Sequence, residues 1–247
     1  MRLDGVERFD PFRAFGPAVA SRYDDGLRGD EDDAVAFLVR VAGAGPALEF
    51  AVGTGRIAVP LAAGGIAVDG IEVSEAMIER LRAKPGGDAI GVTVGDMSTT
   101  RLDGRYSLVY LVFNTIFNLL TQDDQVRCFE NAAHHLTTDG AFVVEAGIPD
   151  AWVRRDNYVD AEHVGVDRVV FDVCRYDPVT QLLDENHVEL TPEGIRFGPI
   201  VCRLAPPSEL DLMARLAGLR LVERWGGWRG EPFDARSVRH VSVYRAA

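Results

Sequence analysis

Short apolar runs alternate with amphipathic stretches between residues 30 and 147 of this 247-residue chain. Each run has the length of a buried strand, and the stretches between the runs repeat apolar residues at helical spacing. The runs that we interpret as strands cover residues 47–52, 66–71, 89–94, 106–113 and 141–145. Strand–helix alternation of this kind predicts an α/β fold, with a parallel sheet and right-handed crossovers.

Local signals predict where several of the helices begin and end. Ser74 suits the N-cap of a helix over residues 75–83, and Thr121 opens a capping box ahead of the next helix. Ser208 is expected to cap a last helix, which Gly218 ends. These signals support the alternation that the apolar runs indicate.

The pattern changes after Pro149. Apolar runs separated by turn residues indicate antiparallel hairpins over residues 166–176, 181–190 and 195–204. A final pair of strands is expected over residues 219–225 and 238–244. The simplest organisation is a single domain over residues 1–247. Within it we expect residues 150–204 to form an inserted β subdomain and residues 1–29 an N-terminal lid segment.

Three of the expected strands end in a glycine turn or a carboxylate. The first carries Glu49 and runs into Gly53-Thr54-Gly55, the second ends at Glu72, and the third is followed by Asp96. The carboxyl ends of parallel strands meet at one edge of a sheet, where open α/β folds bind ligands. Together these residues predict a nucleoside pocket.

Composition excludes several classes of partner. The net charge of −12 argues against nucleic acid, whose recognition depends on clustered Lys and Arg. The apolar runs are too short to span a bilayer, and the N-terminus lacks the apolar core of a signal peptide. The three cysteines, Cys128, Cys174 and Cys202, are odd in number and without paired spacing, which is typical of free thiols in a reducing compartment. We expect a cytoplasmic protein.

The five histidines show no metal-ligand or nucleophile spacing, so no metal is expected. His134 and His135 end an expected helix, where a cation suits the helix dipole, and His240 lies in an expected strand. His163 and His187 fall in the inserted segment and are candidates for substrate contact. His163 is therefore a candidate catalytic base.

The segment from Leu48 to Gly55 resembles the first motif of the class I S-adenosylmethionine-dependent methyltransferases, with Ala51 in place of the usual first glycine. The resemblance covers roughly residues 20–147 and the C-terminal helix and strand pair. It implies a Rossmann-like, seven-stranded sheet that is mostly parallel, with an antiparallel C-terminal strand, helices on both faces and an inserted antiparallel β lid. Among members of the family, the chain is most similar to bacterial enzymes acting on small natural products, including amino-sugar N-methyltransferases.

The resemblance also implies roles for individual residues. Glu72 would accept hydrogen bonds from both ribose hydroxyls, Asp96 would accept the adenine amino group, and Met97 would pack on the base. Backbone carbonyls of Ala51 and Phe113 would face the methionine ammonium. The cofactor-binding residues expected on this basis are Tyr23, Glu49, Ala51, Gly53, Gly55, Glu72, Val73, Asp96, Met97 and Phe113.

The acceptor is expected to be a small molecule, a natural product or other metabolite, methylated on N, O or C by direct displacement. Tyr23, in a Tyr-Asp element that would fold over the cofactor, joins His163 as a candidate catalytic residue. The candidates for substrate contact are Asn114, Phe117, Trp152, Tyr158 and His187. A general base is needed only for a protonated amine or a hydroxyl of high pKa. We expect a monomer or homodimer that engages neither nucleic acid nor membrane.

Two alternatives remain at this point. The residues from Gly53 to Ala58 also fit the dinucleotide fingerprint, with Glu72 as its ribose carboxylate, which would make the protein an NAD-dependent oxidoreductase. The second alternative is a protein of the same fold that binds the cofactor but transfers no methyl group, because fold does not decide function.

Overall fold

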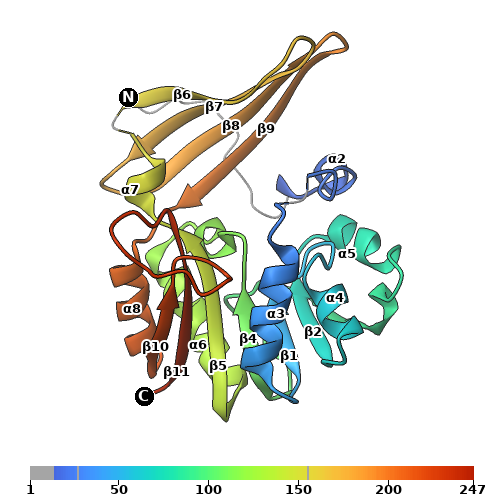
Figure 1. Ribbon diagram of the computed structural model, residues 1–247, viewed down its shortest axis with the longest axis vertical. Coiled ribbons are helices and arrows are strands. Elements are labelled where there is room, and N and C mark those ends of the chain that lie inside the picture. Colours follow the sequence, from blue (N-terminus) through green and yellow to red (C-terminus); the bar gives the residue numbers. More distant parts are fainter. Residues whose placement is uncertain (1–13, 27, 155) are drawn as a thin grey trace.

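The computed structural model describes residues 14–26, 28–154 and 156–247 and contains two sheets (Figure 1). The larger has seven strands in the order β10-β11-β5-β4-β1-β2-β3. Their bounds are β1 Ala47–Phe50, β2 Val68–Glu72, β3 Gly91–Val94, β4 Tyr106–Leu111, β5 Leu136–Gly147, β10 Leu219–Trp225 and β11 Arg239–Ala246. Strands β1 to β5 pair in parallel, and β11 runs antiparallel to both of its neighbours. The predicted mostly parallel sheet is confirmed.

Helices cover both faces of this sheet. On one face, α3 (Glu31–Ala42), α4 (Ala58–Ala63) and α5 (Glu75–Arg82) contribute to a core that includes Phe37, Leu61 and Leu81. On the other, α6 (Gln122–His135) and α8 (Pro207–Leu216) contribute to a core that includes Phe129, Phe142 and Met213. Burial on both faces explains why the parallel strands are continuous apolar runs. Among the described helices, none is long and apolar enough to cross a membrane.

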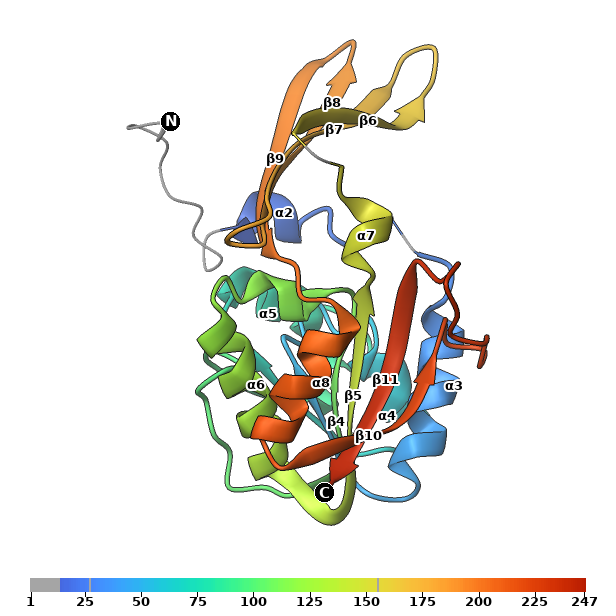
Figure 2. The same cartoon turned by 90° about the vertical axis from the view of Figure 1, so that its left-hand side faces the viewer.

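The second sheet is an antiparallel meander of β6 (Asn157–Val164), β7 (Val169–Asp177), β8 (Leu182–Thr191) and β9 (Gly194–Arg203). It lies beyond the carboxyl ends of the central strands, on the side where the short helices α2 (Pro17–Ala20) and α7 (Pro149–Trp152) are found (Figures 1 and 2). Of the segment 1–29 that we expect to act as a lid, residues 1–13 and 27 lie outside the described residues.

Two predicted helix caps are confirmed. The Ser74 hydroxyl accepts from the backbone N–H of Met77 at 3.2 Å, and the Thr121 hydroxyl accepts from that of Asp124 at 3.1 Å. The predicted cap at Ser208 is wrong. Helix α8 begins at Pro207 with Pro206 as its N-cap, so Ser208 lies inside the first turn. Proline suits the first helical position, where its fixed φ is helical and no N–H is needed.

Two strands differ from the prediction. Strand β5 begins at Leu136 rather than at residue 141, because its pairing with β4 shifts register between Tyr106 and Leu108 and extends the strand. Strand β6 was not predicted at all. It is an edge strand with mostly exposed side chains, so its sequence lacks the apolar alternation that marked the other three strands of the meander. Cys128, Cys174 and Cys202 carry free thiols, as expected.

Candidate active site

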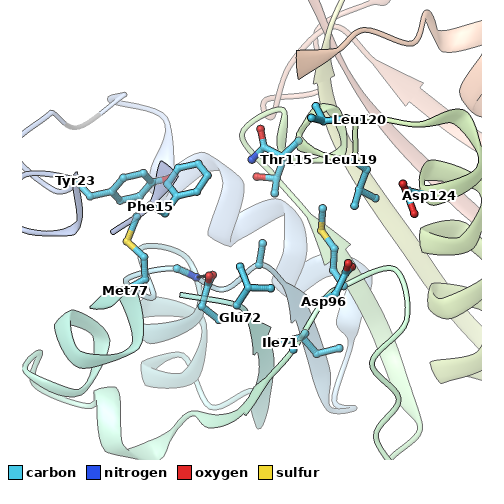
Figure 3. A pocket seen from close by; sticks show the side chains of 16 residues that line it. Phe15, Tyr23, Ile71, Glu72, Met77, Asp96, Thr115, Leu119, Leu120 and Asp124 are labelled. Carbon is cyan, nitrogen blue, oxygen red and sulfur yellow. Dashed lines mark hydrogen bonds between the residues drawn. The ribbon is translucent and has the colours of Figure 1, made fainter. Parts of the chain in front are cut away.

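A cleft with a cavity volume of about 230 Å³ opens at the carboxyl edge of the central sheet. Its walls come from the ends of β1, β2 and β3, from the N-terminal segment, and from the turn that follows β4 (Figure 3). Seven of the expected cofactor-binding residues line it: Tyr23, Ala51, Gly53, Glu72, Val73, Asp96 and Met97. The structure therefore brings the three strand ends together, as their spacing in sequence indicated.

In the turn after β1, every second residue has a left-handed backbone conformation. Ala51, Gly53 and Gly55 have φ angles of 53°, 54° and 73°. Gly55 lies behind the cleft, where an added Cβ would come within 3.0 Å of Leu81 and Val59. Its role is close packing of the turn against helices, whereas Gly53 lines the cleft itself. Ala51 holds a conformation that costs an alanine free energy and that glycine adopts freely.

Glu72 braces this turn from the neighbouring strand. One carboxylate oxygen accepts from the backbone N–H of Gly53 and the other from that of Ser74, both at 2.8 Å. Burial raises the pKa of Glu72, and the two N–H donors oppose this shift. Since each carboxylate oxygen can accept more than one hydrogen bond, both oxygens keep capacity for donors in the cleft.

The third strand end is organised by a tight turn and by α6. An Asp96 carboxylate oxygen accepts from the Ser98 backbone N–H at 2.7 Å. The Asn131 side chain, on α6, donates to the carbonyl of Met97 at 2.9 Å. Figure 3 shows Asp96 at the floor of the cleft, between Glu72 on one side and Leu119 and Asp124 on the other.

Glu49 lies behind the cleft rather than on its wall. Its side chain is only 3% exposed, and a carboxylate oxygen accepts from the Tyr110 hydroxyl at 2.8 Å. Burial raises the pKa of Glu49 to about 8, although the hydrogen bonds from Tyr110 and the Ala58 backbone oppose the shift. Its bond to Ala58 ties β1 to the start of α4 and so supports the glycine turn from below.

The N-terminal segment is fastened over the cleft by polar contacts. Asp24 accepts from the Thr54 hydroxyl at 2.7 Å and pairs with Lys84 at 2.9 Å. Arg56 donates to the carbonyl of Tyr23 at 2.5 Å and stacks on its ring at 4.8 Å. Partial burial raises the pKa of Asp24, but the bonds from Lys84 and Thr54 outweigh this and leave the pKa below its ordinary value. The ring of Tyr23 is thereby held at the mouth of the cleft.

Neither Phe113 nor Asn114 lines the cleft, yet both shape the turn after β4. Their φ angles are 57° and 64°. The Phe113 backbone N–H donates to the buried Glu145 carboxylate at 2.9 Å, and the Asn114 side-chain oxygen accepts from the N–H of Gly147 at 2.7 Å. Glu145 also pairs with Arg28 of the N-terminal segment at 3.2 Å. These bonds connect the turn, β5 and the N-terminal segment.

The expected acceptor residues separate into three locations. Trp152, Tyr158 and His187 line a second cavity, on the inner face of the four-stranded sheet. Phe117 is fully buried and meets the edge of Trp152 with ring centroids 6.0 Å apart. His163 lies near the far end of β6, opposite Val170, and lines neither cavity.

Several lining residues were not expected from sequence: Phe15, Met77, Asn118, Leu119, Leu120 and Asp124. They come from the N-terminal segment, from α5, from the loop that joins β4 to α6, and from the first turn of α6. The sequence marks Asp124 as part of the capping box of α6, which predicts a role in helix capping but not its place on the cleft wall. Phe15 lies in a stretch without strand or helix periodicity, so nothing in its surroundings marked it.

Comparison with known proteins identifies the family to which this chain belongs. A family model described as a methyltransferase domain matches residues 47–140. The CcbJ methyltransferase of Streptomyces caelestis is 38% identical, with 97% of this chain and 100% of that chain covered and a TM-score of 0.91. This chain is a class I S-adenosylmethionine-dependent methyltransferase.

Two further relatives extend the comparison. A cypemycin N-terminal methyltransferase from Streptomyces is 27% identical over 207 residues, which cover 79% of this chain and 81% of the relative. The fold is shared with S-adenosylmethionine-bound CalS10, an amino pentose methyltransferase from Micromonospora echinaspora, at 21% identity and a TM-score of 0.68, covering 93% and 95% of the two chains. The methyl donor is S-adenosylmethionine, and the dinucleotide and non-methylating alternatives are set aside.

Proposed function

We propose that this methyltransferase acts on an amine nitrogen of a small natural product. The observation that carries the proposal is the convergence of the first three strand ends on one cleft, whose wall toward the second sheet is the turn after β4. The relative named as a cypemycin N-terminal methyltransferase supports nitrogen as the acceptor atom. An amine is also the acceptor that needs least from the protein, because the neutral form attacks without a base.

The residues of the cleft fit the cofactor. Glu72 keeps acceptor capacity on both oxygens for the two ribose hydroxyls, and Asp96 presents a carboxylate at the floor for the adenine amino group. Met97 and Leu119 supply apolar walls for the base. Ala51 lines the cleft with its backbone in the left-handed region, and we assign its carbonyl to the methionine portion.

When bound, S-adenosylmethionine would supply the methyl group. The amine lone pair would form the new bond at the methyl carbon while the bond from that carbon to the positively charged sulfur breaks. The protein must therefore align the two reactants and exclude water. Tyr23 covers the mouth of the cleft, and burial raises the pKa of its hydroxyl while Arg56 opposes the shift only in part. The hydroxyl stays neutral near pH 7, so its role is to orient the amine rather than to take its proton. His163 receives no role, because it lies outside the cleft.

Acceptor recognition is assigned to the two segments outside the strand–helix alternation. Residues 14–26 reach the cleft through Phe15 and Tyr23, and the segment 150–204 holds the second cavity. We propose that both act as lids of a single methyltransferase domain.

The test is formation of S-adenosylhomocysteine with matched panels of primary amines, phenols and thiols. Turnover with amines, and little or none with the other two panels, is the expected result. A preference for phenols would overturn the choice of nitrogen while leaving the methyltransferase assignment intact. The variant Tyr23→Phe separates orientation from cofactor binding, because loss of kcat with unchanged cofactor affinity indicates action on the acceptor.

A further inference from the structure

The second cavity is separate from the cleft that fits the cofactor. It has a cavity volume of about 320 Å³ and lies against the inner face of the four-stranded sheet. The two cavities share no lining residue. Trp152 of α7 closes one side, and Leu183, only 3% exposed, forms part of the floor. This cavity is a second candidate binding site, and the proposed methyl transfer assigns no role to it.

Two aromatic side chains form its wall in a defined orientation. The Tyr158 hydroxyl donates to the carbonyl of Trp152 at 3.2 Å, which joins β6 to the end of α7. The Trp152 ring is held in turn by its edge contact with Phe117. Faces of tryptophan and tyrosine attract organic cations, most strongly where water is excluded.

The remaining wall is strongly acidic. Asp172 on β7 lies directly opposite His187 on β8, and Glu185 shares the same face because it is two residues from His187. The imidazole of His187 contacts the carboxylate of Asp172 with one nitrogen and that of Glu185, at 3.0 Å, with the other. Asp160 and Glu162 of β6 also line the cavity. Asp160 pairs with Arg154 at 2.5 Å, so four carboxylates face one imidazole and one guanidinium. Asp172 is only 7% exposed.

The position of the cavity relates it to the reaction. Phe117, which meets Trp152, belongs to the short turn η2 (Thr115–Asn118), and Thr115 and Asn118 of that turn line the cofactor cleft. Strand β9 also contacts this turn, through Cys202 and Asn118. This turn therefore lines the cofactor cleft and also packs, through Phe117, against Trp152 of the second cavity.

We propose that the second cavity binds a second ammonium group of the acceptor, one that is not methylated, so that the substrate class is diamines and polyamine-bearing natural products. This inference rests on the proposed function, since it takes the other amine to be the methyl acceptor. The aromatic wall and the excess of carboxylates supply the two interactions that an ammonium group needs. A neutral tail would take water from these carboxylates without compensation, and an anionic tail would be repelled by them.

The experiment measures binding of a series of α,ω-diamines, from 1,4-diaminobutane to 1,8-diaminooctane, with n-alkylamines of equal length as matched monoamines. Calorimetry is done on the full chain saturated with S-adenosylhomocysteine. One diamine length should bind at least about tenfold more tightly than its monoamine, the effect of one hydrogen bond to a charged group. Glu185→Gln and Asp172→Asn should each abolish this preference, so that a diamine binds no more tightly than its monoamine.

Asp184→Asn is the matched control. Asp184 neighbours Glu185 on β8 but pairs with Arg175 and does not line the cavity, so its loss changes net charge equally without touching the site. The control should keep the diamine preference. Equal affinity for diamines and monoamines at every length, or a preference that survives in Glu185→Gln, would overturn the inference.

Mn²⁺ is titrated in parallel, because Asp172, Glu185 and His187 place one ligand atom each within 4.8 Å of one another. Stoichiometric Mn²⁺ binding that Glu185→Gln abolishes, without any diamine preference, would identify a metal site and refute the ammonium assignment. The outcomes also separate the two proposals. Diamine preference without amine methylation leaves the cavity assignment standing and removes the proposed function, whereas methylation of monoamines without diamine preference does the reverse.

Discussion

The two cavities are built from different parts of β-strands. In the cofactor cleft, Glu72 ends β2 and Asp96 follows β3, so the order of parallel strands is enough to bring them to one edge. In the second cavity, Asp172, Glu185 and His187 lie in the middle of β7 and β8, and they meet because those strands pair in one register. A site at strand ends depends on topology, and a site on a strand face depends on register.

The two sheets also differ in how much of their surface is buried. The central sheet has helices on both faces, whereas the outer face of the four-stranded sheet exposes Val159 and Phe197 by 59% and 66%. The cofactor cleft is therefore supported by a core from behind. The second cavity depends on a sheet that is anchored mainly at its base, and substitutions at that base should affect it most.

The largest effect is expected at the base itself. Arg203, at the end of β9 and only 5% exposed, donates to Gln125 of α6, to Gln181 and to Glu209 of α8 at 2.5, 2.6 and 2.7 Å. Arg203→Met leaves these acceptors without their donor, and unfolding in urea should show a loss of about 3 kcal/mol.

The control for Arg203 is Arg196→Met on the same strand, where an exposed arginine pairs with Glu189. It should cost less than about 1 kcal/mol. Similar losses in both variants would show that the base does not anchor the sheet.

The next effect concerns the strand-end site. Glu72→Ala should weaken S-adenosylmethionine binding by about 1.5–3 kcal/mol, because hydrogen bonds to a charged carboxylate are lost. Part of the loss reflects the glycine turn, since Glu72 accepts from the Gly53 N–H. Calorimetry on Glu72→Ala and on Glu75→Ala, an exposed neighbour on α5, measures it. Unchanged affinity in a folded Glu72→Ala protein would remove Glu72 from the cofactor site.

A smaller effect, of opposite sign, is expected for the turn after β1. Ala51→Gly should raise the free energy of unfolding by about 0.5–1 kcal/mol, because glycine adopts the observed φ of 53° without the cost that an alanine incurs. Ala36→Gly, at an exposed position within α3, should instead destabilise by about 1 kcal/mol. Thermal unfolding of both variants tests the pair, and destabilisation by Ala51→Gly would contradict the argument from strain.

The smallest effect is a titration in the strand-face site. The hydrogen bond to Glu185 raises the pKa of His187 to about 9, with Asp172 contributing in the same direction against the effect of burial. The imidazolium therefore stabilises the fold fully below its unfolded pKa of about 6.5, and this contribution is lost as the pH rises toward 9. Half of the side chain is exposed, so the change in stability is small.

Nuclear magnetic resonance of the His187 ring should show this titration directly. In Glu185→Gln the midpoint should fall toward about 6.5, whereas Asp184→Asn should leave it in place. A midpoint near 6.5 in the wild-type protein would mean that the two carboxylates do not hold the imidazole.

Sequence reasoning located the cofactor cleft better than the residues around it. Glu72, Asp96 and the glycine turn followed from apolar runs that end in polar residues, a signal contained within a few positions of each other. Phe15 and Leu119 also line the cleft, yet their positions depend on how the N-terminal segment and the loop after β4 fold back. Strand β6 was missed for a related reason, because an exposed edge strand has no buried face to impose alternation.

The sequence alone determined the strand order along the chain and the edge where acidic strand ends meet, because hydrophobic periodicity and parallel crossovers act locally and leave few alternatives. Tertiary structure decided which polar residues face a cavity. Glu49 and Glu72 both belong to strands that lead to the cleft, but only packing places Glu49 under the Tyr110 hydroxyl and Glu72 on the wall. Likewise, the pairing of β7 with β8 places Asp172 opposite His187. The spacing of these two residues in the sequence does not predict this contact.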